Sequence, residues 1–555
     1  MSKIFKIFDI MGLTRLAMGG TVYDWYIATT GNDTTGDGTK DLPYLTVAKV
    51  LTVISADETV WVEAGTYLFG NVTINKGLWY SNGALWKDNS GAGSFILLGT
   101  ADIKLFQGIT FDRDSTGTNG LFINSGCSNA TFNSCSFINM TSYFLQSHAS
   151  AGADFTWNSC NIEGGSSGVL FTYAQNMLFD GCTITNILGN GFYRYGSSGF
   201  LSVTNSTLTQ VGGHAFYHRT VGDLIIDNNT INITSNFTGL ILHNSYFAAD
   251  LTITNNIINI TAVSTADLLR LNDARFDNIT IDNNTITTDA TFTKGIVYVT
   301  PKVSVSVSGN TIIHPISSVL SSYQIRIIGG TDAFTAAVND NIINGYNKDG
   351  YNIGVGSETT TANDDKITLT ATGNTIYSAL FYDDALPVGP HGIFVGFMKL
   401  MTVEDNYVNG AGIGIALEND GASYSGVDVT GNTLINNIEH FRHKGVSDLE
   451  ISVNIFRSEK TFCTGMISGS TQLAGEHSIN TDINNNILYE GTGVTLSTAW
   501  ISYDADNATG ISVDFDTVWS VDNDPKYTIG ADVMTDWAEI QTAGYEANGN
   551  NTNPF

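Results

Sequence analysis

Tyrosine, arginine and histidine recur at matching places in four short segments, residues 191–195, 215–219, 239–243 and 268–272. Each segment has the composition of a strand, and strand side chains alternate between the two faces of a sheet. We take the inward residues to be Phe192, Phe216, Leu240 and Leu269. The outward columns are then Tyr193, Tyr217, Ile241 and Arg270, followed by Tyr195, Arg219, His243 and Asn272. The same register sends Arg194 and His218 inward, and a slip of one residue would exchange the columns.

This set of residues can perform β-elimination on an acidic polysaccharide. The reaction needs a base near the C5 proton, a cation beside the adjacent carboxylate and an acid for the leaving oxygen. The candidate catalytic residues are Tyr217, Arg219, His243 and Arg270. The candidate substrate-binding residues are Tyr193, Tyr195, His218, Asn272 and Arg275. The alternative is an ordinary solvated face, whose tyrosines are present because they form strands well.

Two further groups of residues bear on chemistry. The run from His440 to Lys444 holds four ionisable groups, which suit either an anion site or, more simply, a polar loop. Asp383 and Asp384 lie seven or eight residues before His391 and offer the paired carboxylates of an inverting glycoside hydrolase. That separation is too short to place the groups on different repeats, so hydrolysis is disfavoured.

Calcium is the one cofactor for which ligands are present. Aspartates gather in two stretches, and calcium prefers oxygen ligands. The two sets are Asp33, Asp37 and Asp41, and Asp514, Asp516, Asp522 and Asp524. Neither set has EF-hand spacing, and turn formation explains the first set better. Phosphate-binding, dinucleotide-binding and serine-hydrolase signatures are missing from the sequence, so no other cofactor is expected.

A long repeat must position these residues. A small polar residue, followed two positions later by an apolar one, recurs every 22–33 residues, which is the signature of a solenoid. The repeated position is occupied by Cys135, Cys160, Cys182, Ser206, Asn229, Asn256, Asn284, Asn310, Asn341, Asn374, Asn406, Asn432, Asn454 and Asn486. Inward amides one coil apart can hydrogen-bond in a continuous column. The three cysteines cannot all pair, so we expect buried free thiols.

Composition and charge limit the function classes. The 555 residues include 7 prolines and 58 glycines, and the formal net charge is −29. Binding to nucleic acid or to an anionic membrane requires clustered lysine and arginine, so neither partner is expected. No apolar stretch reaches the roughly 18 residues of a membrane span.

The N-terminal residues are expected to lead into the solenoid. In residues 1–20, Asp9 and Arg15 interrupt what would be the apolar core of a signal peptide, so we expect a leader or attachment segment. Apolar residues at 44, 47, 48, 51 and 54 have helical spacing, and Pro43 suits a first helical turn. A helix at this point would cap the open first coil.

Several motifs carry a family resemblance. The turn-rich stretch 31–39, the PYLTVAKV sequence at 43–50 and the VWVEAGTY sequence at 60–67 resemble the N-terminal part of right-handed parallel β-helix proteins of the pectate-lyase-like superfamily. The column of asparagines and the stretch 537–541 also resemble theirs. This resemblance implies an all-β, right-handed parallel β-helix solenoid of about 15 coils. It implies a cap and first coils at 21–100, the β-helix at 101–500 and a closing element at 501–555. It also implies that ligands lie on the outward face of the first strand of each coil.

The resemblance implies no single activity, because the superfamily includes lyases, hydrolases, epimerases, phage tailspikes and inert scaffolds. We expect a phage virion protein, namely a tailspike, fibre or decoration protein that engages a surface polysaccharide. Its other partners would be virion proteins, and a homotrimer is one expected assembly. The alternatives are a free extracellular polysaccharide lyase and a purely structural scaffold.

Overall fold

The computed structural model describes the chain from residue 22 onward, with some exceptions. These are residues 70–71, 89–93, 99–103, 114–118, 124–126, 141–142, 148–152, 166–167, 174–175, 187–190, 196–198, 210–212, 220–221, 235–236, 244–248, 262–266, 272–275, 290–294, 315–322, 329–332, 346–349, 357–366, 379–390, 397–399, 419–425, 460–461, 471–479, 492–493, 497–498, 505–509, 515, 521–524 and 552–555. The predicted leader, residues 1–20, also lies outside the described residues.

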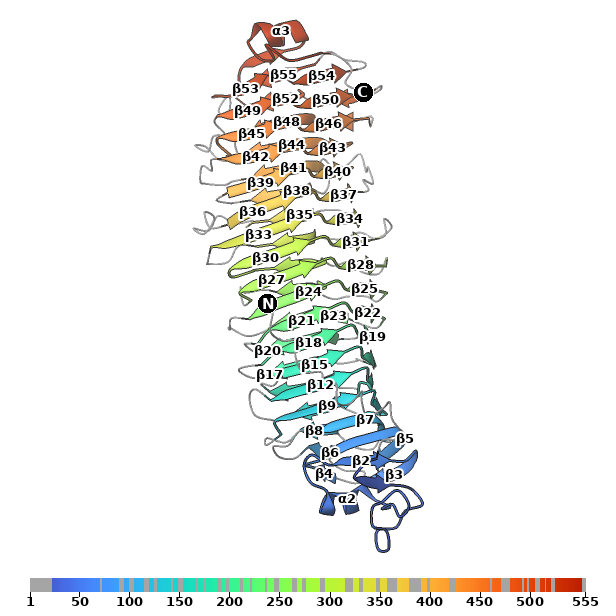
Figure 1. Ribbon diagram of the computed structural model, residues 1–555. Coiled ribbons are helices and arrows are strands. Elements are labelled where there is room, and N and C mark those ends of the chain that lie inside the picture. The colour runs from blue at the N-terminus through green and yellow to red at the C-terminus, as the bar shows by residue number, and fades with distance from the viewer. Residues whose placement is uncertain are drawn as a thin grey trace. The chain divides into compact units, whose positions relative to one another are not determined.

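Parallel strands make up most of the described residues in both compact units of the chain, Met1–Thr183 (unit 1) and Ile184–Phe555 (unit 2). Each coil contributes three strands in turn, and each strand pairs in parallel with its equivalent in the next coil (Figure 1). Three series of strands result in each unit, which we call the first, second and third sheets. The predicted all-β parallel solenoid is thereby confirmed.

The strands of unit 2 are as follows. The first sheet contains β17 (Phe192–Tyr195), β20 (Gly213–Arg219), β23 (Phe237–His243), β26 (Leu269–Leu271), β29 (Val297–Val299), β32 (Tyr323–Ile327), β35 (Tyr351–Val355), β38 (His391–Gly396), β41 (Ile413–Glu418), β44 (Glu439–Lys444), β48 (Gly465–Ser470), β52 (Ile501–Tyr503) and β55 (Tyr527–Ile529). The second contains β18 (Leu201–Thr204), β21 (Leu224–Asp227), β24 (Asp250–Thr254), β27 (Asn278–Asp282), β30 (Ser304–Ser308), β33 (Phe334–Asn339), β36 (Ile367–Thr372), β39 (Leu400–Glu404), β42 (Val427–Thr430), β45 (Leu449–Ser452), β49 (Thr481–Asn484) and β53 (Ser512–Asp514). The third contains β19 (Thr207–Leu208), β22 (Thr230–Ile233), β25 (Ile257–Ile260), β28 (Thr285–Thr288), β31 (Thr311–Ile313), β34 (Ile342–Gly345), β37 (Thr375–Ser378), β40 (Tyr407–Asn409), β43 (Thr433–Ile435), β46 (Ile455–Ser458), β50 (Ile487–Glu490) and β54 (Thr517–Ser520). Outside these sheets, β47 (Phe462–Cys463) pairs with β51 (Thr495–Leu496).

Unit 1 repeats this arrangement with two long strands. Its first sheet contains β4 (Val72–Ile74), β6 (Ser94–Leu98), β8 (Asn119–Ile123), β11 (Tyr143–Ser147) and β14 (Gly168–Tyr173). Its second contains β1 (Trp25–Ile27), β2 (Thr59–Val62), β5 (Leu78–Asp88), β7 (Leu105–Asp112), β9 (Asn129–Asn133), β12 (Asp154–Asn158) and β15 (Asn176–Asp180). Its third contains β3 (Gly65–Phe69), β10 (Ser136–Ile138) and β13 (Asn161–Glu163), together with the second halves of β5 and β7. The short β16 (Thr183–Thr185) spans the boundary between the units.

A single column of asparagines holds the turn between the second and third strands of unit 2. The Nδ2 of Asn341 donates to Oδ1 of Asn374 at 2.9 Å and to the carbonyl of Val307 at 2.7 Å. The backbone N–H of Asn341 donates to the same Oδ1 at 3.1 Å. These three bonds recur at every asparagine from Asn229 to Asn454, so the inward amides form the predicted continuous column.

In unit 1, cysteines occupy the position in the coil that asparagines occupy in unit 2. The thiols of Cys135, Cys160 and Cys182 donate to the carbonyls of Phe106, Phe132 and Trp157 at 3.3–3.4 Å. All three are buried and free, as the sequence predicts. Aromatic rings stack behind them: Phe132 and Trp157 lie 5.5 Å apart, and Trp157 and Phe179 lie 4.5 Å apart.

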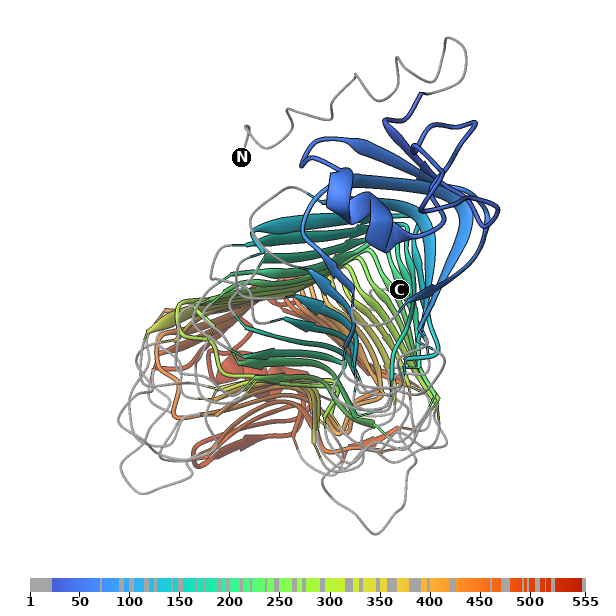
Figure 2. The ribbon, with the colours of Figure 1, turned by 90° about the horizontal axis from the view of Figure 1, so that it is seen from below.

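A helix lies at the start of unit 1. Helix α2 (Val47–Val53) buries Val47 and Val50, and the Thr46 hydroxyl accepts the Lys49 N–H at its N-terminus. It crosses the end of the coils in Figure 2. The prediction that Pro43 stands in the first helical turn is wrong, because the carbonyl of Pro43 and the N–H of Tyr44 instead bond to the loop and strand before them.

The C-terminal residues cover the last coil of unit 2. Asp516 continues the asparagine column, since its Oδ1 accepts the backbone N–H of Asn486 at 2.6 Å. The backbone N–H of Asp516 donates to Glu546, and β54 is bridged by Asn550. The last strand of the first sheet, β55, pairs in antiparallel fashion with β56 (Asp532–Met534), which precedes helix α3 (Trp537–Thr542).

The outward faces of unit 2 differ in charge. The second-sheet strands hold no lysine, arginine or histidine, and their outward acidic residues are Asp227, Asp250, Asp282, Glu404, Asp428, Glu450, Asp482 and Asp514. The third-sheet strands pair so that two outward columns form. The first column is Thr207, Thr230, Ile257, Thr285, Thr311, Ile342, Thr375, Tyr407, Thr433, Ile455, Ile487 and Thr517, and the second is Asn232, Asn259, Thr287, Ile313, Asn344, Tyr377, Asn409, Ile435, Arg457, Tyr489 and Trp519. We call these two columns the third-sheet face.

Candidate functional site

Several basic and aromatic residues of unit 2 lie on one line of positions across its first sheet. In the observed register, this line begins with Tyr193 and Tyr217 and continues through Leu242, Arg270, Tyr298, Arg326, Gly354, Phe394, Ala416 and Arg442. The rings of Tyr193 and Tyr217 stack 4.6 Å apart. Tyr193, Tyr217 and Arg270 therefore share a column, as predicted.

The predicted register of β23 is wrong by one residue. Strand β23 contains one residue more than β20 between the pairs Gly213↔Phe237 and His214↔Gly239. Ile241 consequently occupies an inward position, where it is 1% exposed, instead of the outward column. His243 aligns with His218 and not with Arg219. Because Leu240 and Ile241 are both buried, simple alternation could not fix this register.

Several predicted site residues lie wholly or partly outside the described residues. Asn272 and Arg275 are outside them altogether. Tyr195, His218, Arg219 and His243 are placed as strand positions, but their side chains are not described. The catalytic roles given to Tyr217, Arg219, His243 and Arg270 therefore stay predictions.

Arg194 points inward, as the predicted register requires. It is buried, and burial lowers the pKa of its guanidinium to about 9, while the nearby Asp223 carboxylate acts in the opposite direction. Arg194 therefore belongs to the interior of the coil and not to the outward surface.

Four side chains on β26, β29 and β32 form an arginine–tyrosine cluster. The guanidinium of Arg270 lies 5.9 Å from the ring centre of Tyr298, and that of Arg326 lies 5.7 Å from the same ring. The Arg326 guanidinium is also 5.4 Å from the ring centre of Tyr323. Arg270 is exposed, whereas Tyr298 and Arg326 are half-buried. Two cations are thus held on the outward surface by neighbouring rings.

A buried carboxylate fixes one edge of this cluster. The hydroxyl of Tyr323 donates to Oδ2 of Asp267 at 3.0 Å, and the backbone N–H of Gly295 donates to Oδ1 at 3.0 Å. Burial and then the charge of Asp267 raise the pKa of Tyr323, so its hydroxyl keeps its proton. Tyr323 is therefore held in one orientation beneath Arg326.

Of the cluster, only Arg270 was identified from the sequence as a site residue. Tyr298 and Arg326 stand between two buried apolar residues, in the sequences Val297-Tyr298-Val299 and Ile325-Arg326-Ile327. Leu269-Arg270-Leu271 has the same form. Extending that three-residue pattern to the following coils would have found both residues.

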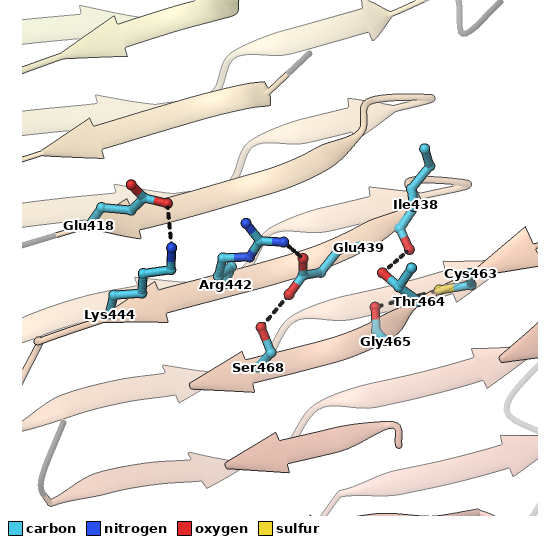
Figure 3. A network of polar contacts seen from close by, with 9 residues as sticks. All are labelled: Glu418, Ile438, Glu439, Arg442, Lys444, Cys463, Thr464, Gly465 and Ser468. Atoms are coloured by element: carbon cyan, nitrogen blue, oxygen red, sulfur yellow. Dashed lines mark hydrogen bonds and ion pairs between the residues drawn. The ribbon is translucent and has the colours of Figure 1, made fainter. Parts of the chain in front are cut away.

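The run from 440 to 444 lies within strand β44, so the prediction of a polar loop is wrong. His440 and His443 are fully buried, and burial lowers the pKa of each to about 3. Arg442 pairs with Glu439, which also accepts the Ser468 hydroxyl, and Lys444 lies 3.5 Å from Glu418 (Figure 3). Arg442 and Lys444 are therefore both paired with carboxylates, whereas an anion site requires a cation that can bind the anion.

His391 starts strand β38 beside two aromatic rings. Its ring centre lies 5.2 Å from that of Tyr351 and 5.7 Å from that of Phe394. Burial, and then the charges of Arg442 and Lys444, lower its pKa to about 4, so it is neutral at pH 7. Asp383 and Asp384 lie outside the described residues.

The aspartates proposed as calcium ligands mostly accept hydrogen bonds from the chain. Asp33 accepts the N–H groups of Leu45 and Thr46, and Asp37 accepts that of Thr39. Asp514 accepts the N–H of Asn548. Asp522 and Asp524 are outside the described part of the chain, and within that part no group of three or more potential metal ligands occurs. Nor does any helix there have the length and apolarity to cross a membrane.

Comparison with known proteins supports the fold. Residues 146–312 match the family model described as right handed beta helix region. Comparison by sequence with characterised proteins gives no significant match.

Several solved structures are similar over most of their length. The A-module of the Azotobacter vinelandii mannuronan C-5 epimerase AlgE6 is 11% identical, with a TM-score of 0.24 over 90% of this chain and 92% of that one. A mannuronic acid specific polysaccharide family 6 lyase from human gut microbiota is 13% identical, with a TM-score of 0.20 over 90% and 87%. The tailspike of the Escherichia coli bacteriophage HK620, in complex with a hexasaccharide, is 10% identical, with a TM-score of 0.21 over 84% and 69%. From its strand order and the matched family model, the chain is a right-handed parallel β-helix.

Proposed function

We propose that the first-sheet surface of unit 2 binds an acidic polysaccharide through the arginine–tyrosine cluster. The observation that carries this proposal is the pair of guanidinium groups, Arg270 and Arg326, on either side of the Tyr298 ring. Guanidinium groups bind carboxylates through charge-assisted hydrogen bonds. On a chain of net charge −29, an exposed arginine beside a second one marks where an anion can approach.

The geometry favours hydrogen bonding to the sugar over stacking on it. Tyr193 and Tyr217 stack on each other at 4.6 Å, and the Tyr298 ring has an arginine at each side. Ring faces engaged in this way are not available to a sugar, so the tyrosines would contribute their edges and hydroxyl groups. The cations would then provide most of the affinity.

Affinity electrophoresis in gels containing alginate or pectate tests this proposal. Replacement of Arg270 or Arg326 by alanine is expected to weaken binding by about 10- to 100-fold, because a hydrogen bond to a charged group contributes about 1.5–3 kcal/mol. Arg457→Ala is the matched control, since Arg457 lies 5.3 Å from the Tyr489 ring but on the third sheet. Equal losses in all three variants would contradict the proposed site. Binding should also weaken as salt is added.

We further propose that the protein is virion-associated, as a phage tailspike, fibre or decoration protein. The support is the resemblance of its N-terminal and C-terminal motifs to such β-helix proteins. Mass spectrometry of purified virions tests this assignment: the chain should occur at a fixed number of copies per particle. Its presence only in the culture medium would favour a free extracellular protein.

A polysaccharide lyase is the second candidate, favoured by the position of Tyr298 between two cations. In β-elimination the cations neutralise the uronic acid carboxylate, a base removes the C5 proton, the C4–O bond breaks to leave a C4–C5 double bond, and an acid protonates the departing oxygen. The unsaturated product absorbs ultraviolet light. Tyr298→Phe should abolish an increase in absorbance while retaining binding. A constant absorbance with every polymer would leave binding as the function.

A further inference from the structure

The third-sheet face of unit 2 is almost free of charge. Its two columns contain threonine, isoleucine, asparagine, tyrosine and tryptophan, and Arg457 is the one charged residue at these positions. Arg457 is paired with Glu459, so its charge is compensated. The neighbouring second sheet carries outward acidic residues on most of its strands, as described above. In unit 2 the outward face of the second sheet is therefore acidic, whereas the third-sheet face is nearly uncharged.

This face also exposes large apolar side chains. Ile257, Ile313, Ile342 and Tyr377 are 41–49% exposed and lie on β25, β31, β34 and β37, which form a continuous stretch of the third sheet with β28 (Figure 1). Scattered exposed apolar residues are ordinary, but four of them on one stretch of a sheet with almost no charge indicate an interaction surface. The cores of protein interfaces are likewise depleted of charged residues.

We propose that copies of this chain associate with one another through the third-sheet face of unit 2. Each copy carries a net charge of −29, so two copies repel each other wherever charged surfaces meet. The uncharged face is the one on which they can approach closely. A strongly acidic partner would gain nothing from this face, and neither would a basic one.

The size of the face is sufficient for a stable contact. About eleven coils at roughly 4.8 Å each give a length of about 50 Å, and four residues at about 3.3 Å give a width of about 13 Å. The resulting area is about 650 Å² per copy, or about 1,300 Å² for two copies, which lies within the range of roughly 1,200–2,000 Å² for specific interfaces.

Sedimentation velocity over a range of protein concentrations tests this inference. The unmodified chain should form a defined oligomer at micromolar concentration, and Ile342→Glu should weaken the association by about 10- to 100-fold, because a new pair of like charges would face each other. Leu400→Glu is the matched control. Leu400 is 48% exposed, close to the 45% of Ile342, but lies on the second sheet.

Three results would overturn the inference: a monomer at every concentration, an oligomer that Ile342→Glu leaves intact, or equal disruption by the Leu400 control. Ile257→Glu is the second variant if Ile342→Glu does not fold, as judged by circular dichroism. Salt provides a measurement on the unmodified chain. Added salt should strengthen self-association by screening the repulsion between copies, whereas it should weaken binding to an acidic glycan. The two proposals can therefore fail independently.

Discussion

The inward turn column is built differently in the two units, from cysteine in unit 1 and, after Ser206, from asparagine in unit 2. Each thiol of Cys135, Cys160 and Cys182 reaches a carbonyl of the preceding coil. Each asparagine makes that bond through its Nδ2, and both this Nδ2 and its backbone N–H also donate to the Oδ1 of the next amide. A thiol or an amide can thus fill this position, and the amide bonds through its Nδ2 to the preceding coil and to the next one at the same time. Unit 1 instead stacks large aromatic rings in its core, as Phe132, Trp157 and Phe179 do.

The strongest test of this comparison is the loss of one amide. Asn341→Ala should destabilise the surrounding coils by about 3–5 kcal/mol, because it removes the bonds of the Val307 carbonyl and of both Asn310 donors, and each buried polar group left unpaired costs about 1–3 kcal/mol. Cys160→Ala should cost only about 1–2 kcal/mol. Hydrogen exchange of the amides in neighbouring coils measures both, since a solenoid need not unfold in one step. Equal losses of stability in Asn341→Ala and Cys160→Ala would show that the asparagine and cysteine columns stabilise the coils to the same extent.

The end of the column gives a second test, through Asp516. Burial, and then the Glu546 carboxylate, raise the pKa of Asp516 well above its ordinary 3.8. A carboxyl group with a raised pKa contributes stability that is present below pH 3.8 and is lost as the pH rises through the folded-state pKa. Asp516→Asn should remove this loss and add a donor for the Ile483 carbonyl, a gain of about 1–3 kcal/mol at pH 7.

Thermal unfolding at several pH values checks this prediction. The melting temperature of the unmodified chain should fall with rising pH by more than that of Asp516→Asn. Thr517→Ser is a suitable control, because Thr517 is the outward neighbour of Asp516. Identical pH profiles for the unmodified chain and Asp516→Asn would show that the carboxyl pair does not act on stability.

The smallest expected effect concerns the residue before each asparagine. This residue adopts a positive φ in unit 2 and is usually asparagine, aspartate or glycine, but at one place it is Val453, with φ 59°. A β-branched residue is strained in this conformation. Because Val453 is 61% exposed, Val453→Asn should lose little packing and stabilise the chain by about 1 kcal/mol. Differential scanning calorimetry measures this change in stability. Asn283→Val is the reverse substitution and should lower the stability. A loss of stability with Val453→Asn would contradict the strain.

The sequence predicted the column well because its signal is local. An asparagine followed two residues later by an apolar residue repeats with its turn, so Asn229 and Asn486 could be aligned without knowing the coil between them. The first-sheet register lacked such a signal. Leu240 and Ile241 are both buried, as are Leu268 and Leu269, so alternation gives two equally good registers and β23 was placed wrongly.

The candidate site could be predicted only in part for a similar reason. Arg270 lay in a segment recognised as a first strand, whereas β29 and β32, which hold Tyr298 and Arg326, were not recognised as first strands. Their significance comes from lateral pairing, Arg270 with Tyr298 and Tyr298 with Arg326. Such pairing joins residues 28 positions apart, so the three-residue pattern can mark each residue but cannot show which residue lies beside it in the next coil.

The covering of the last coil bears on how the molecule avoids uncontrolled growth. A parallel β-helix ends in unpaired strands, which can pair with another chain and extend into a fibre. Here the N–H of Val518 donates to the Asn550 carbonyl, and the N–H of Asp516 donates to the Glu546 carboxylate. The amide column ends at Asp516, whose carboxyl group accepts a hydrogen bond from Asn486 but has no amide N–H to donate to a further coil. The column therefore offers no template to an identical coil. The self-association proposed for the third-sheet face would accordingly use the side of the solenoid and not this covered end.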